Sequence, residues 1–482
     1  MSRIESQVGA NGGHAIVVGA SMAGLLAARV LSDHFGKVTL IERDEIVDGS
    51  EPRKGVPQGA HAHALLSKGL EIISALFPGM HEDLIAGGAV EADVATVAWH
   101  QCGVWKLRVP SNIRGMAQSR PFLEWQVRRR VAQLPGVIFL AARRVVGLLV
   151  SKDGASARGV ELAAGDGREL LEADLVVDAA GRGSQAPEWL AAIGHARPQE
   201  CEVGIDIAYA TRLYRRTGLP DYKAMILYPS PPAGKRLGFL FPIEHGRWMC
   251  TLGGLLGDHA PTDDRGYLEF ARTLPVQDLY DVIRGAEPLG VVRVHKIPTS
   301  RWRRYDKLRG MPGGFLVIGD AVCSFNPIYG QGMTVSALEA LALDACLREQ
   351  ADGRDRARLI RRFHRRTAQI VAAAWRLATG EDFQYPETEG HRPLGTVIVN
   401  AYVARLHKRV ACDPEVLLSF YRVVHMLASP TSLFHPRIVL RVLAGRGKRA
   451  APASSIAEAL LLEGERDAVE PVCAESGSRS RR

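Results

Sequence analysis

Short apolar runs separated by a helical pattern predict an α/β arrangement in the first part of the chain. Each run is rich in β-branched residues and leads into a loop of small residues, as buried parallel strands do. Helical patterns follow two of the runs, over residues 22–31 and from about Gly332 to Glu349. These features predict one parallel sheet assembled from distant segments. The apolar runs occupy residues 15–18, 38–41, 175–178 and 315–318.

Between these runs the period of the pattern changes to two residues. Alternating apolar and polar positions, broken by Gly, Pro and His, predict an antiparallel sheet. Beyond Pro386 the pattern is helical as far as Leu443. The alternating segments are 90–109, 203–214, 222–228, 236–243 and 247–252.

Composition indicates a globular protein and limits its partners. Of 482 residues, 46% are hydrophobic and 23% charged. The net charge of +9 comes from basic residues spread along the chain, so no nucleic-acid partner is expected. The seven cysteines form no CxxC, which argues against a metal site or a disulfide framework and fits a reducing compartment. No apolar run reaches the roughly 18 residues of a transmembrane helix. We therefore expect a cytoplasmic protein.

A glycine motif lies at the first strand-to-helix turn. Gly19-Ala-Ser-Met-Ala-Gly24 stands where G-x-G-x-x-G is found in dinucleotide-binding proteins, with Ser21 in place of the middle glycine. The helix N-terminus that follows offers N–H groups to a pyrophosphate. Glu42 ends the second strand, where a carboxylate would accept hydrogen bonds from an adenosine ribose. The order predicts a dinucleotide site; a glycine-rich turn in an unrelated α/β protein is the alternative.

A second subsite is predicted after the last apolar run. Asp320 follows that run and could hold sugar-alcohol hydroxyls. The helix start flanked by Gly330 and Gly332 can approach another electron-rich group without interference from side chains. FAD has a ribityl chain and an isoalloxazine ring to occupy such a subsite, whereas NAD has neither.

The motifs resemble those of the FAD-dependent monooxygenases of the aromatic-hydroxylase and squalene-epoxidase superfamily, from about Ala15 to Leu443. Within that superfamily the chain is most similar to the polyene epoxidases of polyether biosynthesis, of the lasalocid and monensin type. The segments that carry the resemblance are Arg53–Gln58 with His61 and His63, Ser119–Trp125, Val177–Ser184 and Gly319–Met333.

The resemblance implies a set of FAD-binding residues, no metal ligand and no nominated catalytic side chain. For the pyrophosphate, ribose and adenine it implies Gly19, Ser21, Ala23, Gly24, Glu42, Arg43 and Arg53. For the ribityl chain and the isoalloxazine it implies Val56, Gln58, Arg120, Asp320, Pro327, Gly330, Gln331, Gly332 and Met333.

The resemblance also implies the reaction. Reduced FAD forms a C4a-hydroperoxide with O₂ and transfers one oxygen to a hydrophobic small molecule. We expect epoxidation of an alkene in a polyene- or polyketide-like metabolite, because the sequence shows no acid–base pair for deprotonating a phenol. Ala180-Gly181 stands where aromatic hydroxylases often carry Asp-Gly. This leaves two routes open for NAD(P)H, direct binding or a partner flavin reductase.

Four alternatives remain. An aromatic hydroxylase and a geranylgeranyl-type flavin reductase would use the same scaffold. A flavin-dependent halogenase is disfavoured because the chain lacks a Trp-x-Trp-x-Ile-Pro segment. A non-enzymatic FAD-binding protein is the least favoured. The oligomeric state stays open.

The fold class expected is α/β, with a discontinuous Rossmann-like FAD-binding domain, an interleaved antiparallel-sheet substrate domain and a helical C-terminal region. The FAD-binding domain is predicted at 14–75, 110–185 and 295–385, the substrate domain at 76–109 and 186–294, the helical region at 386–450 and a disordered tail at 451–482.

Three further features have less specific interpretations. His61 and His63 are interpreted as surface histidines, or as loop residues near the flavin, rather than as metal ligands. Cys323 is expected to be a small buried residue. The basic amphipathic segment 436–450 is expected to be a helix packed on the flavin domain, with weak peripheral contact to an anionic membrane as the alternative.

Overall fold

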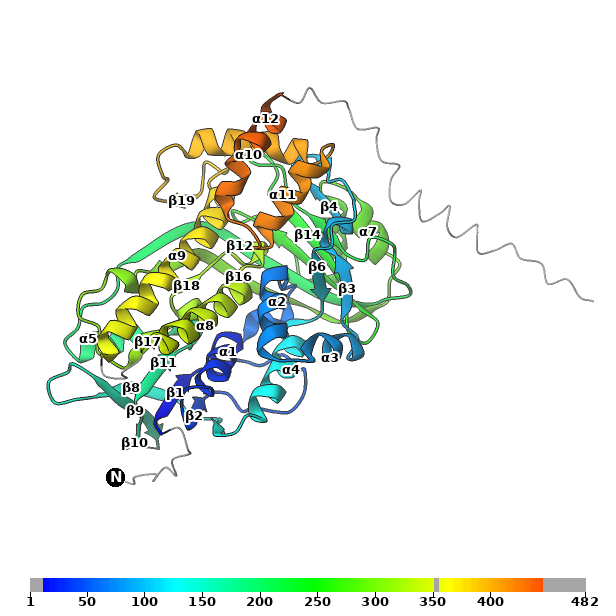
Figure 1. Ribbon diagram of the computed structural model, residues 1–482. Helices are drawn as coiled ribbons and strands as arrows, with labels where there is room; N and C mark the ends of the chain where they lie inside the picture. The colour runs from blue at the N-terminus through cyan, green and yellow to red at the C-terminus, as the bar shows by residue number, and fades with distance from the viewer. Residues whose placement is uncertain (1–11, 166, 351–354, 445–482) are drawn as a thin grey trace, which may run out of the picture.

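The computed structural model, which describes residues 12–165, 167–350 and 355–444, contains a five-stranded parallel sheet (Figure 1). Its strand order is β17-β11-β1-β2-β7, and every neighbouring pair is parallel. The predicted sheet is thus confirmed, with β7 as an additional edge strand. The strands are β1 (His14–Val18), β2 (Lys37–Ile41), β7 (Val137–Leu140), β11 (Leu175–Asp178) and β17 (Phe315–Val317).

Both faces of this sheet are buried, which explains the continuous apolar runs. Along β1, Ala15 and Val17 pack into one core, and Ile16 and Val18 into another. The first core lies under α1 (Met22–Leu31), α2 (Ser67–Leu76), α3 (Met80–Ala86), α4 (Arg120–Ala132) and α8 (Gly332–Arg348). The second is covered by α5 (Ala186–Ala192), α9 (Arg356–Asp382) and a small antiparallel sheet of β8 (Val145–Val150), β9 (Ala157–Ala164) and β10 (Gly167–Glu172).

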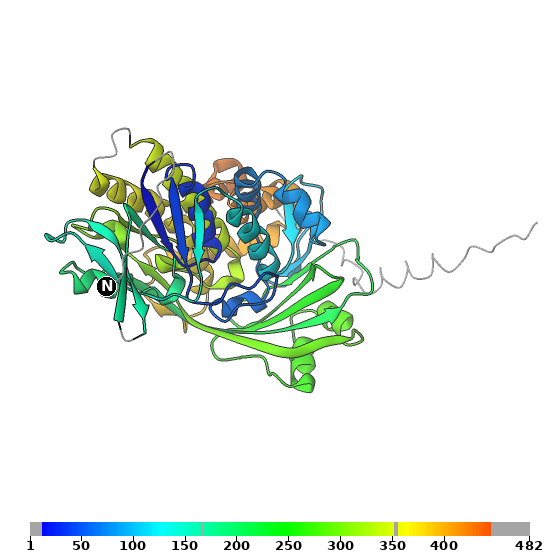
Figure 2. The same cartoon turned by 90° about the horizontal axis from the view of Figure 1, so that it is seen from below.

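A nine-stranded, mostly antiparallel sheet forms a second layer, seen in green below the rest of the molecule in Figure 2. Helices α6 (Asp264–Arg272) and α7 (Asp278–Ile283) pack on it. The predicted domain boundary at 294 falls inside β16. A separate pair joins β3 (Val90–Asp93) to β6 (Arg114–Ala117). The nine strands are β4 (Ala98–Gln101), β5 (Val104–Trp105), β12 (Glu200–Arg215), β13 (Met225–Leu227), β14 (Arg236–Ile243), β15 (Arg247–Gly254), β16 (Pro288–Arg303), β18 (Cys323–Ser324) and β19 (Glu389–Gly390).

Three C-terminal helices cover one end of the molecule, drawn in orange in Figure 1. They are α10 (Thr396–Arg409), α11 (Pro414–Val424) and α12 (Pro436–Ala444). Helical structure beyond Pro386 is confirmed, apart from β19. Helix α12 packs through Ile438 and Val442 on α10 and α11, so its expected packing on the flavin domain is wrong.

Two predictions cannot be compared with the structure, since 445–450 and the predicted tail 451–482 lie outside the described residues. Within the described ranges, no helix combines the length and apolar character needed to cross a membrane.

Candidate functional site

A cavity of about 590 Å³ opens at the carboxyl ends of the parallel strands, where ligands bind in such sheets. It brings together fourteen of the sixteen predicted cofactor-binding residues. The other two, Gly24 and Arg53, lie behind its wall. We call this space the polar cavity. The fourteen are Gly19, Ser21, Ala23, Glu42, Arg43, Val56, Gln58, Arg120, Asp320, Pro327, Gly330, Gln331, Gly332 and Met333.

The glycine turn is closely packed. Gly19 has φ +98°, and a Cβ there would lie 2.6 Å from the Ala179 carbonyl oxygen. A Cβ on Gly24 would lie 1.8 Å from the Gly19 carbonyl oxygen. Gly19 therefore permits the turn, while Gly24 permits the close approach of α1 to β1 and does not itself face the cavity.

The N-terminus of α1 has no side-chain cap. The N-cap residue is Ser21, and its hydroxyl donates to Glu124 Oε2 (2.7 Å) instead of accepting from the first helical turn. N–H groups at the start of a helix attract anions when nothing caps them. The neighbouring carboxylate of Glu42 accepts from the backbone N–H of Ala20 (2.9 Å), which fixes the turn against β2.

Glu124 binds the two arginines beside the glycine turn, a role that the sequence analysis did not predict. Its Oε1 accepts from Arg53 Nε (3.1 Å), and its Oε2 also lies 3.4 Å from Arg120 Nη2. Burial opposes ionisation of this carboxyl, but Arg120 and Arg53 outweigh it and hold its pKa below the usual value. Arg53 also lies 3.3 Å from Glu42. Arg53 therefore stabilises the turn, whereas Arg120 lines the cavity. The buried Nε of Arg120 has no hydrogen-bond partner among the described residues.

The second half of the cavity is built at the start of α8. Glu339 Oε2 accepts from the N–H of Gly319 (2.6 Å), and burial raises the pKa of Glu339 to about 8. Asp320 faces the cavity, and burial raises its pKa too, against the opposing charges of Arg120 and Arg182. The side chain of Gln331, the N-cap residue of α8, makes no capping hydrogen bond, and its buried Oε1 has no hydrogen-bond partner among the described residues.

These features fit FAD. The uncapped start of α1 with Arg120 suits a pyrophosphate, and Glu42 at the end of β2 suits a ribose. Asp320 and the uncapped start of α8 suit a ribityl chain and a ring that accepts hydrogen bonds.

A second, apolar cavity of about 180 Å³ adjoins the polar one. Four residues line both: Ala64, Pro327, Gly330 and Gln331. Its walls come from the nine-stranded sheet and the helices α9, α10 and α11. Of the aromatic residues on the sheet, Trp99, Phe239 and Phe241 line it, whereas Trp248 packs in a core under α6. Helices α10 and α11 therefore cover this cavity as a roof.

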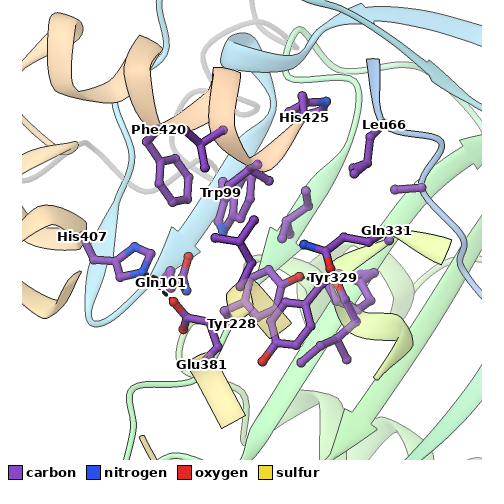
Figure 3. A pocket seen from close by; sticks show the side chains of 18 of the residues that line it. Leu66, Trp99, Gln101, Tyr228, Tyr329, Gln331, Glu381, His407, Phe420 and His425 are labelled. Atoms are coloured by element: carbon purple, nitrogen blue, oxygen red, sulfur yellow. Dashed lines mark hydrogen bonds and ion pairs between the residues drawn. The ribbon is translucent and has the colours of Figure 1, made fainter. Parts of the chain in front are cut away.

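Polar side chains interrupt the apolar wall on one side. Gln101, Glu381 and His407 lie together there, away from Gln331 and Leu66 (Figure 3). His407 Nε2 lies 3.4 Å from Glu381 Oε1. The buried amine of Lys106 stands behind them, 3.0 Å from Gln101 Oε1. No sequence motif signalled this group, because its members come from β4, the segment after β5, α9 and α10.

Two histidines contradict a prediction. His61 is buried and its Nδ1 lies 2.8 Å from Thr211 Oγ1, while His63 lines the polar cavity. Their interpretation as surface residues is therefore wrong. Burial lowers the pKa of His61 to about 3 and that of His63 to about 4, so both are neutral near pH 7. Cys323 is buried, as predicted.

Comparisons with known proteins agree with this architecture. No protein-family model matches the chain. Among solved structures, it is similar to the flavin-dependent brominase Bmp2 (TM-score 0.63, 15% identity, covering 94% of this chain and 100% of that one). It is also similar to pqsL from Pseudomonas aeruginosa, described as a probable FAD-dependent monooxygenase (TM-score 0.58, 17% identity, covering 77% and 97%). The fold is therefore that of FAD-dependent monooxygenases and halogenases.

A similar curated protein identifies the family of this chain. Protein Rv3254 of Mycobacterium tuberculosis is 36% identical over 409 residues, covering 80% of this chain and 84% of that protein. The chain belongs to the family of Protein Rv3254.

Proposed function

We propose that the protein is an FAD-dependent monooxygenase that transfers one oxygen atom of O₂ to an apolar small molecule, by epoxidation of an alkene. One observation carries the proposal: the apolar cavity meets the predicted isoalloxazine end of the polar cavity at Ala64, Pro327, Gly330 and Gln331. A substrate in the apolar cavity would lie beside the reacting edge of the ring. Solved structures of the same fold include a probable FAD-dependent monooxygenase and a flavin-dependent brominase.

When bound, reduced FAD supplies the activation of O₂. One oxygen atom enters the product and the other leaves as water, with two electrons from NAD(P)H, delivered directly or through a reductase. The residues of this chain hold and shield the reactants. Arg120 and the starts of α1 and α8 bind the cofactor, and Phe239, Phe241 and the roof helices exclude water from the substrate side.

The test is isotopic. The FAD-loaded protein is supplied with NAD(P)H, a flavin reductase, ¹⁸O₂ and the alkene probe farnesol. We expect an epoxide that carries one ¹⁸O atom. A product with two added hydrogens and no oxygen would contradict the proposal in favour of a reductase, and a protein that binds no FAD would overturn it altogether.

A second candidate, aromatic hydroxylation, is favoured by the Glu381–His407 pair in the cavity wall, because a carboxylate next to an imidazole can accept a proton from a phenol. The same assay with 2-naphthol as probe distinguishes the two reactions. If 2-naphthol gives a dihydroxynaphthalene that carries ¹⁸O while farnesol is left unchanged, the reaction is hydroxylation and not epoxidation.

A further inference from the structure

The polar group in the wall of the apolar cavity has a defined pattern of donors and acceptors. Lys106 Nζ lies 3.0 Å from Gln101 Oε1 and 3.4 Å from His407 Nδ1. The Lys106 amine has hydrogens to donate to both atoms, and His407 Nε2 faces the carboxylate of Glu381, which only accepts. The ring hydrogen of His407 therefore lies on Nε2, and Gln101 Oε1 and His407 Nδ1 act as acceptors for Lys106. Burial lowers the pKa of His407, so the ring is neutral and carries its hydrogen on Nε2. That hydrogen points to Glu381 Oε1, 3.4 Å away.

This pattern leaves a free donor on Gln101. Its amide Nε2 lies 3.5 Å from His407 Nε2, which is itself a donor. Two donors cannot satisfy each other, so an N–H of Gln101 remains for a ligand in the cavity that Gln101 lines.

It also leaves acceptor capacity on Glu381. Its Oε1 faces His407, and its Oε2 accepts from Gln384 Nε2 (2.6 Å). An ionised carboxylate has about four acceptor positions, so about two remain. The Glu381 side chain is 24% exposed, against 1% for His407, and it lines the cavity.

Several other polar groups in the wall of the apolar cavity are already paired. Tyr228 donates to the Ile328 carbonyl oxygen, and Tyr329 donates to Asp382 Oδ1 (2.9 Å). His425 Nδ1 accepts from the backbone N–H of Ser67 (3.2 Å). Trp99 Nε1 and Gln331 Oε1 also lack a hydrogen-bond partner among the described residues. Trp99 only donates, and Gln331 lies where the apolar cavity meets the polar one. A free donor beside a free acceptor therefore remains at Gln101 and Glu381.

We infer that Gln101 and Glu381 form a subsite for a single hydroxyl group of an otherwise apolar substrate. A hydroxyl donates to Glu381 and accepts from Gln101 at once, which neither an ether nor a hydrocarbon does. A carboxylate would be repelled by the carboxylate of Glu381. Because the subsite lies across the cavity from Gln331 (Figure 3), the reacting carbon is at the end of the molecule remote from the hydroxyl. That last point rests on the proposed function; the hydroxyl preference does not.

The experiment measures binding to the FAD-loaded protein without NAD(P)H. The probes are farnesol, its methyl ether and farnesoic acid, followed by quenching of tryptophan fluorescence, to which Trp99 in the wall contributes. We expect farnesol to bind about tenfold more tightly than the ether, the effect of one charge-assisted hydrogen bond. Farnesoic acid should bind more weakly than farnesol.

Two variants test the residues separately. Glu381→Leu removes the acceptor, and Gln101→Glu removes the donor while keeping an acceptor for Lys106. Glu381→Leu should bring farnesol to the affinity of the ether and leave the ether within about twofold. Gln101→Glu should weaken the binding of both ligands, because the alcohol oxygen and the ether oxygen both accept from Gln101. The matched control is Glu387→Gln, an exposed glutamate that pairs with Lys235 on the surface. It should leave the preference unchanged.

Equal binding of farnesol and its ether by the unmodified protein would overturn the inference, as would a preference that survives in Glu381→Leu, or tighter binding of farnesoic acid. Failure of the proposed function looks different. In that case farnesol is preferred in binding, but no oxygenated product forms.

Discussion

Arg53 and Glu124 face each other behind the glycine turn, with Arg53 Nε 3.1 Å from Glu124 Oε1. The guanidinium also donates to the Ala20 carbonyl oxygen (3.1 Å). Because Glu124 holds Ser21 as well, one buried carboxylate connects the turn, the Arg53 segment and α4. The geometry of the predicted pyrophosphate site thus depends on a residue that does not line the cavity.

Replacing Glu124 by Gln should destabilise the FAD-free protein more than the FAD-loaded one. Loss of this charge removes the paired carboxylate of Arg120 and leaves Arg53 with Glu42 alone, and breaking a buried pair costs about 3–5 kcal/mol. A bound pyrophosphate would neutralise part of that charge. Thermal unfolding with and without FAD measures the difference. Equal losses of stability in the two states would show that Arg120 does not face the cofactor.

Gly24→Ala should weaken both folding and FAD binding. The new methyl group would lie 1.8 Å from the Gly19 carbonyl oxygen, so α1 must move off β1, at a cost of about 1–3 kcal/mol. Gly285→Ala is the matched control, because open space surrounds its Cβ position and it lines neither cavity. Denaturant unfolding and FAD titration of both variants provide the readout. A Gly24→Ala protein as stable as the control would refute the packing role.

Lys106 should make stability increase with pH. Burial lowers its pKa to about 7 from the ordinary 10.5, so between these values the unfolded chain binds a proton that the folded chain has lost. The free energy of unfolding therefore rises with pH in this window, by at most about 1.4 kcal/mol per pH unit. Below pH 7 both states are protonated and the folded state keeps the full cost of the buried charge.

Lys106→Met should remove that rise, whereas Lys152→Met, at an exposed turn between β8 and β9, should keep it. Urea unfolding at pH 6, 8 and 10 tests both variants. If the free energy of unfolding of Lys106→Met rises with pH at the same slope, another titratable group causes the rise.

Val403→Trp should separate the two cavities functionally. Val403 lies on α10 and lines the apolar cavity but not the polar one. A larger side chain there therefore fills the substrate space and leaves the polar cavity unchanged. We expect farnesol binding to fall at least tenfold while FAD affinity stays within twofold. Val399→Trp, an exposed position one turn earlier on α10, should change neither. Weakened FAD binding in Val403→Trp alone would contradict the assignment of the cavities.

The parallel sheet was predictable because its strands are buried on both faces and leave continuous apolar runs. β16 was not predicted, since many of its residues are exposed or half-buried and its pattern lacks a buried face over much of its length. The residues of the polar cavity were predictable because they belong to local motifs at the ends of strands. The Gln101–Glu381–His407 group did not, because Gln101 and His407 are 306 positions apart and meet only through tertiary packing.

The roof of the apolar cavity has a consequence for biosynthesis. Trp99, Phe239 and Phe241 leave the ribosome well before the helices that cover them, α10 and α11. At ordinary elongation rates this delay lasts roughly ten seconds or more. During that time the nascent chain carries an open aromatic groove, which is a binding surface for chaperones and a starting point for aggregation.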